Sequence, residues 1–189
     1  MTKPWPASKA GPIMNPEFPT DPMAANQLTP RSKAEFIGRY GHIFEHSPWV
    51  VEDAWERRPF ADEAALHAAF MEVVEMAGAA AQLKLLTAHP ELAAKVELTE
   101  ASEAEQKGAG LKKLTAAEFN RFSALNVAYR EKFQFPFIVC VRLHDKESIL
   151  QAFEARLGHD AATERREAIA QIGLITQLRL RDLLESAVK

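Results

Sequence analysis

Residues 115–133 read TAAEFNRFSALNVAYREKF, and this stretch gives a clear local indication of the fold. It opens on a capping box, in which the side chains of Thr115 and Glu118 accept hydrogen bonds from free amides at the first turn of a helix. We therefore expect a helix that begins here and ends near Phe133. Start and stop signals of the same kind recur on both sides of it.

Further capping signals predict helices before and after this stretch. Ser32 and Glu35 form a second capping box, followed by apolar residues at helical spacing. Ser47 is a candidate N-cap that puts Pro48 at the first helical position. The short helix that starts at Pro48 is expected to end at Arg57, and a longer one, capped by Asp62, to end at Met76. After a break at Gly78, another helix should end near Ala88, and the next should run from Thr99 or Ser102 towards Lys107. The last two helices are expected over Lys146–Leu157 and Ala162–Ser186, with a stop at Gly158 between them.

The one strand-like run extends from Phe135 to Arg142. It is short and isolated, so we expect an extended segment that crosses the core. Seven of the eleven prolines fall within residues 1–30, and proline lacks the backbone donor that helices need. The sequence thus predicts an all-α fold, with a single compact multi-helix domain over residues 31–189 and a flexible tail over residues 1–30. A tail that docks on a neighbouring subunit is the alternative.

Charge and composition narrow the class of protein. A formal net charge of −3, with Lys and Arg spread among Glu and Asp, argues against nucleic acid as a partner, because such proteins carry a basic stripe. No uninterrupted apolar run approaches the roughly 18 residues needed to cross a bilayer, so no membrane partner is expected. The single cysteine suits a reducing compartment. With no signal peptide and no peroxisomal signal, we expect a cytoplasmic protein.

His89, followed by Pro90, lies at the expected C-terminal end of a helix. An imidazole has a reference pKa of about 6.5 and can donate or accept a proton near neutrality. The C-terminal end of a helix favours the protonated form. The alternative is a structural histidine that caps helix carbonyls.

The segment from Ser102 to Gln106 carries a second polar group. If it is helical, Ser102, Glu105 and Gln106 share one face, because residues three and four apart are neighbours on a helix. A hydroxyl, a carboxylate and a carboxamide on one face can hold a polar, amide-rich ligand. The alternative is a solvated helix start, where acidic residues favour the helix dipole.

Arg179 falls, at helical spacing, in the apolar stripe formed by Ile172, Ile175 and Leu183. Arg181 lies on the opposite side and is expected to be exposed. A guanidinium among apolar neighbours is costly unless it is paired, so Arg179 should meet a carboxylate. That partner is either an internal Asp or Glu, or the substrate.

Residues 42–46 match H-x-x-E-H, a zinc-peptidase pattern in which two histidines bind metal beside a glutamate base. Five common residues match by chance fairly often, and a peptidase would also need a third ligand. We therefore expect no metal and keep a zinc site at His42 and His46 only as an alternative. Cys140 lies in an apolar run and is expected to be an inert buried thiol.

Taken in chain order, five motifs resemble those of one family. They are Phe44-Glu-His-Ser-Pro-Trp49, Ala88-His-Pro-Glu-Leu-Ala93, Ser102-x-x-Glu105-Gln106 followed by Ala109-Gly-Leu111, Asn126-x-x-Tyr129 with Lys132-Phe-x-Phe-Pro-Phe137 and the run to Arg142, and Arg179-Leu180. The ordered set, which covers residues 28–184, is similar to the 2-oxo-4-hydroxy-4-carboxy-5-ureidoimidazoline (OHCU) decarboxylases. Members of that family make (S)-allantoin in the last of three steps from urate.

The resemblance implies a catalytic pair and a set of substrate contacts. The catalytic pair is His89 and Glu105, with Arg179 as a required cation. The implied substrate contacts are Pro90, Ser102, Gln106 and, through the main chain, Phe137, Ile138, Val139, Cys140 and Val141. No metal and no cofactor are implied, because a ring C=N bond beside the carboxylated carbon of the family's substrate can accept the electron pair. The implied partners are a ureidoimidazoline substrate and a second subunit in a homodimer.

From the same resemblance we expect His89 and Glu105 to grip the hydroxyl and carboxylate region of the substrate. His89 would then deliver a proton to one face. Arg179 would offset negative charge or orient Glu105. Three alternatives stay open: a zinc hydrolase, a non-catalytic helical module with Arg179 paired internally, and a neighbouring specificity within purine breakdown.

Overall fold

The computed structural model describes residues 28–93 and 98–187 of the 189-residue chain. In these two ranges the chain forms eight α-helices and two short 3-10 helices, and no strand. The predicted all-α fold of a single compact domain is therefore confirmed. The tail predicted over residues 1–30 lies almost wholly outside the described residues and stays a prediction.

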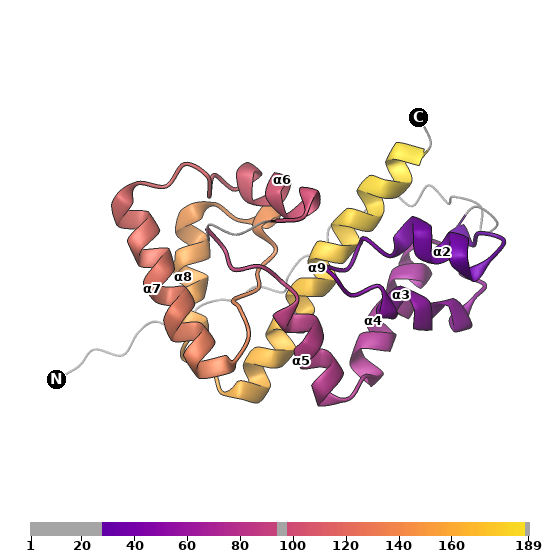
Figure 1. Cartoon of the computed structure of the whole chain (residues 1–189), viewed down its shortest axis with the longest axis horizontal. Helices are drawn as coiled ribbons and strands as arrows, with labels where there is room; N and C mark the ends of the chain where they lie inside the picture. The colour runs from indigo at the N-terminus through magenta and orange to yellow at the C-terminus, as the bar shows by residue number, and fades with distance from the viewer. Residues whose placement is uncertain (1–27, 94–97, 188–189) are drawn as a thin grey trace, which may run out of the picture.

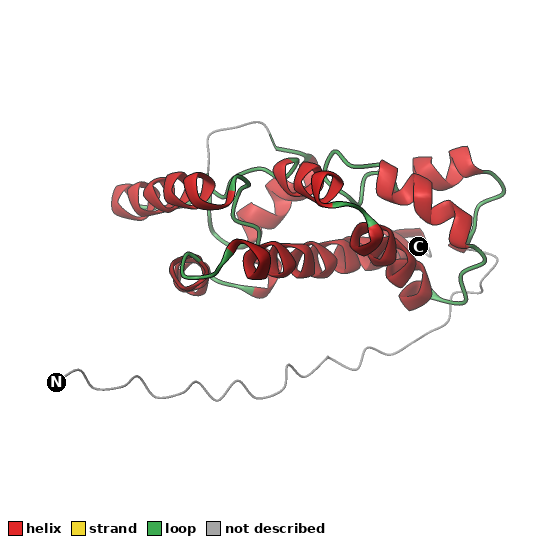
Figure 2. Ribbon diagram, turned by 90° about the horizontal axis from the view of Figure 1, so that it is seen from below, coloured by secondary structure: helices red, strands yellow, loops and turns green. Residues whose placement is uncertain are grey.

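The longest helix, α9 (Ala161–Ala187), runs between two groups of shorter helices (Figure 1). On one side lie the N-terminal helices α2 (Lys33–Tyr40), α3 (Trp49–Ala54) and α4 (Glu63–Met76). On the other side lie α6 (Glu100–Gly108), α7 (Ala116–Phe133) and α8 (Lys146–Arg156). The two groups are joined through α5 (Ala79–Thr87), and α9 packs against both α4 and α7. Figure 2 shows the helical body from below, with α9 running through its middle.

Local capping accounts for most helix starts. Asp62 caps α4 through the amide of Ala65 at 2.7 Å, and Thr99 caps α6. The capping box at Thr115 and Glu118 is complete, as predicted. The predicted boundaries of the last two helices agree with the structure to within one residue.

Two predicted caps were wrong in detail. Ser32 does cap α2, but the Glu35 carboxylate accepts from the amide of Arg31 instead of closing the box on Ser32. The N-cap of α3 is Pro48, not Ser47, and no side chain caps that helix. The Ser47 side chain is buried instead. The predicted end at Arg57 is confirmed, because a 3-10 helix, Trp55–Arg57, continues α3.

The end of α6 is a tight turn that needs glycine. Gly110 has a positive φ of 78°, which residues with a side chain rarely adopt. Its amide donates to the carbonyl of Lys107, and the amide of Leu111 donates to that of Gln106, which is a Schellman arrangement. The turn buries Leu111 and fixes the last turn of α6, which carries two predicted site residues.

The extended segment predicted over residues 135–142 crosses the core, and its residues from Phe135 to Val141 are buried. Its last part differs from the prediction, because Val141–Leu143 curl into a 3-10 helix and Arg142 is exposed. The segment is packed from one side by aromatic rings: Phe137 stacks on Phe153 with centroids 3.9 Å apart.

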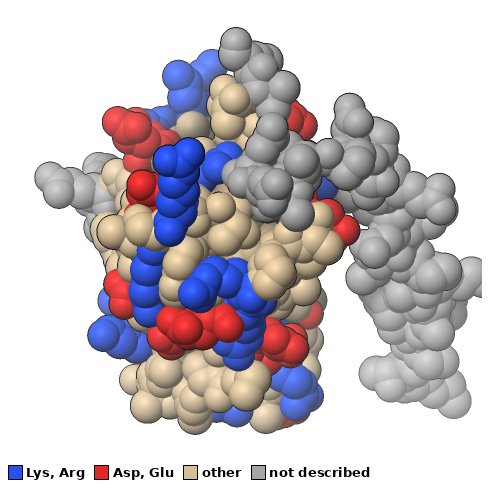
Figure 3. Space-filling view, turned by 90° about the vertical axis from the view of Figure 1, so that its right-hand side faces the viewer, with Lys and Arg blue, Asp and Glu red and all other residues tan. Residues whose placement is uncertain are grey.

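On the face seen in Figure 3, basic and acidic side chains are interleaved, and no large patch carries charges of one sign only. No single helix of the described part is long and apolar enough to cross a membrane. Only α4 and α5 taken together reach that length and composition, and they meet at a bend of 117°.

Candidate active site

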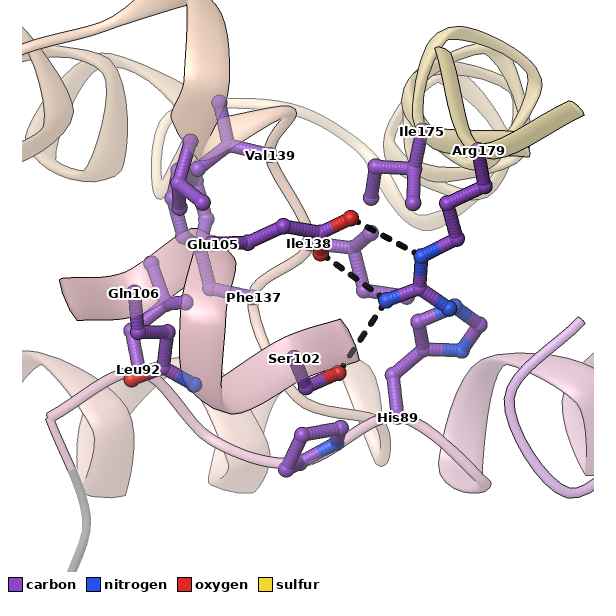
Figure 4. Close-up of a pocket in the computed structure, with 12 residues that line it drawn as sticks. His89, Leu92, Ser102, Glu105, Gln106, Phe137, Ile138, Val139, Ile175 and Arg179 are labelled. Atoms are coloured by element: carbon purple, nitrogen blue, oxygen red, sulfur yellow. Dashed lines mark hydrogen bonds and ion pairs between the residues drawn. The ribbon is translucent and has the colours of Figure 1, made fainter. Parts of the chain in front are cut away.

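A cavity opens where the end of α5, the helix α6, the segment 137–141 and the middle of α9 meet (Figure 4). Ten of the eleven site residues predicted from the sequence line it, and Leu92 and Ile175 complete the lining. The ten are His89, Pro90, Ser102, Glu105, Gln106, Phe137, Ile138, Val139, Val141 and Arg179. Cys140 is the exception: it is fully buried and does not line the cavity.

Arg179 is held entirely by the protein. Its Nε and Nη2 atoms donate to the two oxygens of Glu105, at 2.9 and 2.8 Å, in a bidentate ion pair. Nη1 donates to Glu45 at 3.0 Å and to the carbonyl of Ile43 at 3.2 Å, and Nη2 also donates to the Ser102 hydroxyl at 3.2 Å. A guanidinium has five N–H donors, and all five have a partner here. The carboxylate partner expected for Arg179 is therefore internal.

Glu45 is the site residue that the sequence interpretation did not single out. It is 2% exposed, and its carboxylate accepts from the hydroxyls of Thr99 at 2.6 Å and Ser102 at 2.9 Å as well as from Arg179. Burial alone would raise the pKa of Glu45, but these hydrogen bonds and the charge of Arg179 together lower it. Glu45 is thus a fixed negative charge behind the cavity wall.

The H-x-x-E-H pattern that contains Glu45 does not form a metal site. His42 and His46 are exposed, whereas the glutamate between them is buried against Arg179. Within residues 28–93 and 98–187, no three His, Cys, Asp or Glu side chains are placed to hold a metal ion. The signal that could have identified Glu45 is its place in the first of the five family motifs.

The imidazole of His89 is partly buried, and its hydrogen-bond partner defines its tautomer. Its Nδ1 atom lies 3.0 Å from the carbonyl oxygen of Leu85. Because a carbonyl can only accept, Nδ1 carries the hydrogen and Nε2 carries the lone pair. Burial lowers the pKa of His89 to about 4, although the Leu85 carbonyl and the charge of Glu45 act in the opposite direction. The helix end does favour the protonated form, through the carbonyl of Leu85, but desolvation outweighs this effect.

The loop that carries His89 is anchored just beyond it. Asn126 donates to the carbonyl of Leu92 at 2.9 Å, and the amide of Ala93 donates to Gln106 Oε1 at 3.1 Å. Ala93 has a positive φ of 57°, a strained conformation that these two bonds hold in place. The side-chain oxygen of Gln106 therefore accepts from the loop, and its NH₂ group remains for another partner.

Three kinds of polar group remain for a ligand. They are the lone pair on His89 Nε2, the free lone pairs of Glu105, whose side chain is 13% exposed, and the NH₂ group of Gln106. The main chain adds the amide of Val139 and its carbonyl, neither of which has a hydrogen-bond partner among the described residues. The thiol of Cys140 is not one of them, because burial raises its pKa to about 11. The site thus offers one base, one fixed carboxylate and several amide-like groups.

Comparison with known proteins agrees with the motifs. The family model described as OHCU decarboxylase matches residues 30–181. A 2-oxo-4-hydroxy-4-carboxy-5-ureidoimidazoline decarboxylase of Haloferax volcanii is 42% identical over 151 residues, which cover 80% of this chain and 90% of that protein. The decarboxylase of the same name from Amia calva is 37% identical and covers 86% of this chain and 95% of its own.

Two solved structures are similar to this fold. A crystal structure of (S)-allantoin synthase superposes with a TM-score of 0.70 at 30% identity over 85% of this chain, which spans 54% of that longer chain. A crystal structure of OHCU decarboxylase in the presence of (S)-allantoin superposes with a TM-score of 0.62. At 21% identity, the second match supports the fold alone.

Proposed function

This chain belongs to the OHCU decarboxylase family, and we propose that it catalyses the reaction of that family by the mechanism below. It is a carboxy-lyase that converts 2-oxo-4-hydroxy-4-carboxy-5-ureidoimidazoline to (S)-allantoin in urate degradation. The observation that carries the proposed mechanism is that a neutral, partly buried imidazole and a carboxylate fixed by Arg179 line the same cavity.

The bond that breaks joins the carboxylate to the ring carbon that also bears the hydroxyl group. Its electron pair moves into the ring as carbon dioxide leaves, and the adjacent C=N bond accepts it on nitrogen, which takes a proton from solvent. What remains is an enol that must become a ketone. The substrate itself is the electron sink, so no cofactor is required for this step.

His89 carries out the second half of the reaction. At neutral pH its imidazole is uncharged, because burial lowers its pKa to about 4, and the lone pair on Nε2 is available. We assign to Nε2 the removal of the proton from the enol hydroxyl and the return of a proton to the neighbouring carbon. The same atom acts first as a base and then as an acid. Because His89 reaches the substrate from one side only, protonation gives one enantiomer.

Glu105 orients the substrate, and Arg179 orients Glu105. The bidentate ion pair fixes both carboxylate oxygens, whose remaining lone pairs accept from the hydroxyl or an N–H group of the substrate. Since all five donors of Arg179 are occupied, we assign it a positioning role and not direct binding of the substrate carboxylate. Ser102 acts in the same way, because its hydroxyl joins Glu45 to Arg179.

The charge of the site favours loss of the carboxylate. Two negative charges, on Glu45 and Glu105, face the single positive charge of Arg179, so this group carries a net charge of −1. A substrate carboxylate in the cavity meets no free cation among the residues that line it. Its departure as neutral carbon dioxide therefore relieves an unfavourable interaction.

The urea-like part of the substrate is assigned to the opposite wall of the cavity. The NH₂ group of Gln106 and the main chain of segment 137–141 offer donors and acceptors at that wall, next to Pro90. The remaining expectations from the sequence are also proposals: a homodimer, a cytoplasmic location, and a tail over residues 1–30 before the helical domain. Light scattering of the purified protein tests the first of these.

The decisive experiment couples the protein to urate, urate oxidase and hydroxyisourate hydrolase and follows circular dichroism. We expect rapid growth of a single-handed allantoin signal that a chelator does not reduce. His89→Asn should abolish this signal while leaving the far-ultraviolet spectrum and the melting temperature close to those of the wild type. Slow appearance of racemic allantoin with the wild type would contradict the proposed function, and loss of activity with a chelator would favour a metal hydrolase instead. Full activity of His89→Asn would contradict the proton-transfer role of His89.

A further inference from the structure

The cavity wall formed by segment 137–141 is held from behind at two main-chain groups. Arg156 Nη1 donates to the carbonyl of Ile138 at 2.7 Å. The amide of Cys140 donates to Oε1 of Gln171, on α9, at 2.9 Å. Between these two supports lies Val139, which lines the cavity and whose own amide and carbonyl are without a partner in the described part of the chain.

Peptide geometry fixes the direction of these free groups. In a trans peptide unit, the C=O group and the following N–H group point in opposite directions. The carbonyl of Ile138 points to Arg156, so the amide of Val139 points away from Arg156. The amide of Cys140 points to Gln171, so the carbonyl of Val139 points away from Gln171. Both free groups of Val139 thus face away from their supports, as on the open edge of a β-strand.

Both supports are themselves fixed by carboxylates. Arg156 is 6% exposed and pairs with Glu164, which is fully buried and also accepts from the hydroxyl of Tyr129. The guanidinium of Arg156 also lies 4.6 Å from the centroid of the Phe137 ring. Gln171 is oriented by a bond of 2.9 Å from its NH₂ group to Glu167. A buried ion pair is weak as a source of stability, because desolvation offsets most of its attraction. A positioning role explains why it lies behind this wall.

We infer that Arg156 and Gln171 are positioning residues, which present the main chain of Val139 as a donor and acceptor edge for the N–H and C=O groups of the substrate. The inference rests on the proposed function, since a ureidoimidazoline carries such pairs in its ureido group and its ring. A site built to form both hydrogen bonds rejects analogues that lack them, because its own polar groups are then left unpaired. Neither residue touches the reacting carbon, so they act on binding and not on proton transfer.

The test compares two substitutions at Gln171, one that removes the hydrogen-bond acceptor for the amide of Cys140 and one that keeps it. Gln171→Met removes the acceptor for the amide of Cys140, whereas Gln171→Glu keeps an oxygen there. The matched control is Gln151→Met, because Gln151 makes the same type of bond to a glutamate four residues earlier, on the exposed face of α8. We measure KM, kcat, the melting temperature, and the affinity for (S)-allantoin by calorimetry.

Loss of one neutral hydrogen bond in the support corresponds to a change between about 2- and 12-fold. We expect Gln171→Met to raise KM and to weaken allantoin binding by a factor in this range, with kcat and the pH profile unchanged, as for uniform binding. Gln171→Glu should restore part of the affinity, because it keeps the acceptor for Cys140 but loses the bond to Glu167, and Gln151→Met should match the wild type. A KM unchanged within twofold in Gln171→Met, or a fall in melting temperature alone, would overturn the inference.

A second variant tests the other support independently. Arg156→Lys keeps the charge beside Glu164 but cannot serve both that carboxylate and the carbonyl of Ile138 with one nitrogen. Its control is Arg121→Lys, in an exposed ion pair with Glu154. A rise in KM that is specific to Arg156→Lys supports the inference, and equal values for the two variants contradict it. If the wild type neither turns over OHCU nor binds (S)-allantoin, the proposed function has failed, which is a different result from both of these.

Discussion

Replacing Arg179 with lysine keeps a positive charge in the site but removes the planar fork that fixes Glu105. Arginine has five N–H donors and lysine has three, so at least two of the five contacts of Arg179 must be lost. The bidentate geometry is lost in any case, because a single nitrogen cannot donate along two parallel lines. The side chains involved are 8% and 13% exposed for Arg179 and Glu105, so water cannot readily replace the missing donors.

The expected effect on stability follows from that count. A hydrogen bond to a charged group contributes about 1.5–3 kcal/mol, so two of them contribute roughly 3–6 kcal/mol. For a domain of this size, that corresponds to a fall in melting temperature of roughly 6–24 °C. A wild-type stability above about 6 kcal/mol, within the typical range of about 5–15 kcal/mol, keeps the variant folded at 25 °C. Displacement of Glu105 by about 1 Å should lower kcat/KM about 100-fold.

The matched control is Arg142→Lys. Arg142 also forms a bidentate pair with a carboxylate of α9, Asp182, but these side chains are 35% and 55% exposed. An exposed pair is worth about 1 kcal/mol or less, so this variant should keep its stability within that margin and its activity within twofold. Urea unfolding and the coupled dichroism assay measure both quantities. The positioning role of Arg179 would be refuted if Arg179→Lys kept kcat/KM within threefold, or if both variants lost the same stability.

Glu45→Gln keeps the shape of the side chain but removes its charge and replaces one acceptor oxygen with an NH₂ group, which cannot accept a hydrogen bond. At least one of the three hydrogen bonds of Glu45 is then lost and the others become weaker, while the fork between Arg179 and Glu105 survives. We expect a loss of about 1–3 kcal/mol in urea unfolding and a fall in kcat/KM of about tenfold; a loss larger than that of Arg179→Lys would contradict this order. The lowered pKa of His89 makes stability depend on pH: the unfolded imidazole binds its proton near pH 6.5, whereas the folded one does so only near pH 4. The stability that the neutral His89 contributes to the folded state is therefore complete above pH 6.5, and it decreases by up to about 3 kcal/mol as the pH falls to 4. Urea unfolding at pH 7 and 4.5 should show a larger loss of stability for the wild type than for His89→Gln, and equal losses in the two proteins would show that His89 is not responsible. The kcat/KM of the wild type should keep its value down to about pH 5.

The sequence predicted those features that depend on neighbouring residues. Asp62 and Thr115 cap their helices as expected, because a cap is formed within three residues of the same chain. The cavity-lining residues were found through the resemblance, since spacing alone left both His89 and Glu105 open to structural explanations. Arg179 was predicted to need a carboxylate, and the structure supplies two.

The rest depended on contacts that no local pattern contains. Glu45 reaches Arg179 across 134 residues, and the pattern that surrounds it in the sequence offered only a zinc site, which we kept as an alternative. The lowered pKa of His89 could not be predicted from the sequence, because the local helix end favours the charged form while burial by the folded protein disfavours it more strongly. Cys140 shares an apolar run with residues of the cavity wall, but it is fully buried and does not line the cavity.

The network around Arg179 links catalysis to the assembly of the fold. Its partners Ile43 and Glu45 lie between α2 and α3, and its partners Ser102 and Glu105 belong to α6, so one side chain of α9 joins both groups of helices. Substitutions here should therefore change stability and activity together, whereas those at Gln171, which supports only the cavity wall, should separate them. Cofactor-free decarboxylation depends on groups that are oriented before the substrate arrives. Placing that orientation in a buried contact between the two groups of helices makes the active site as rigid as the core.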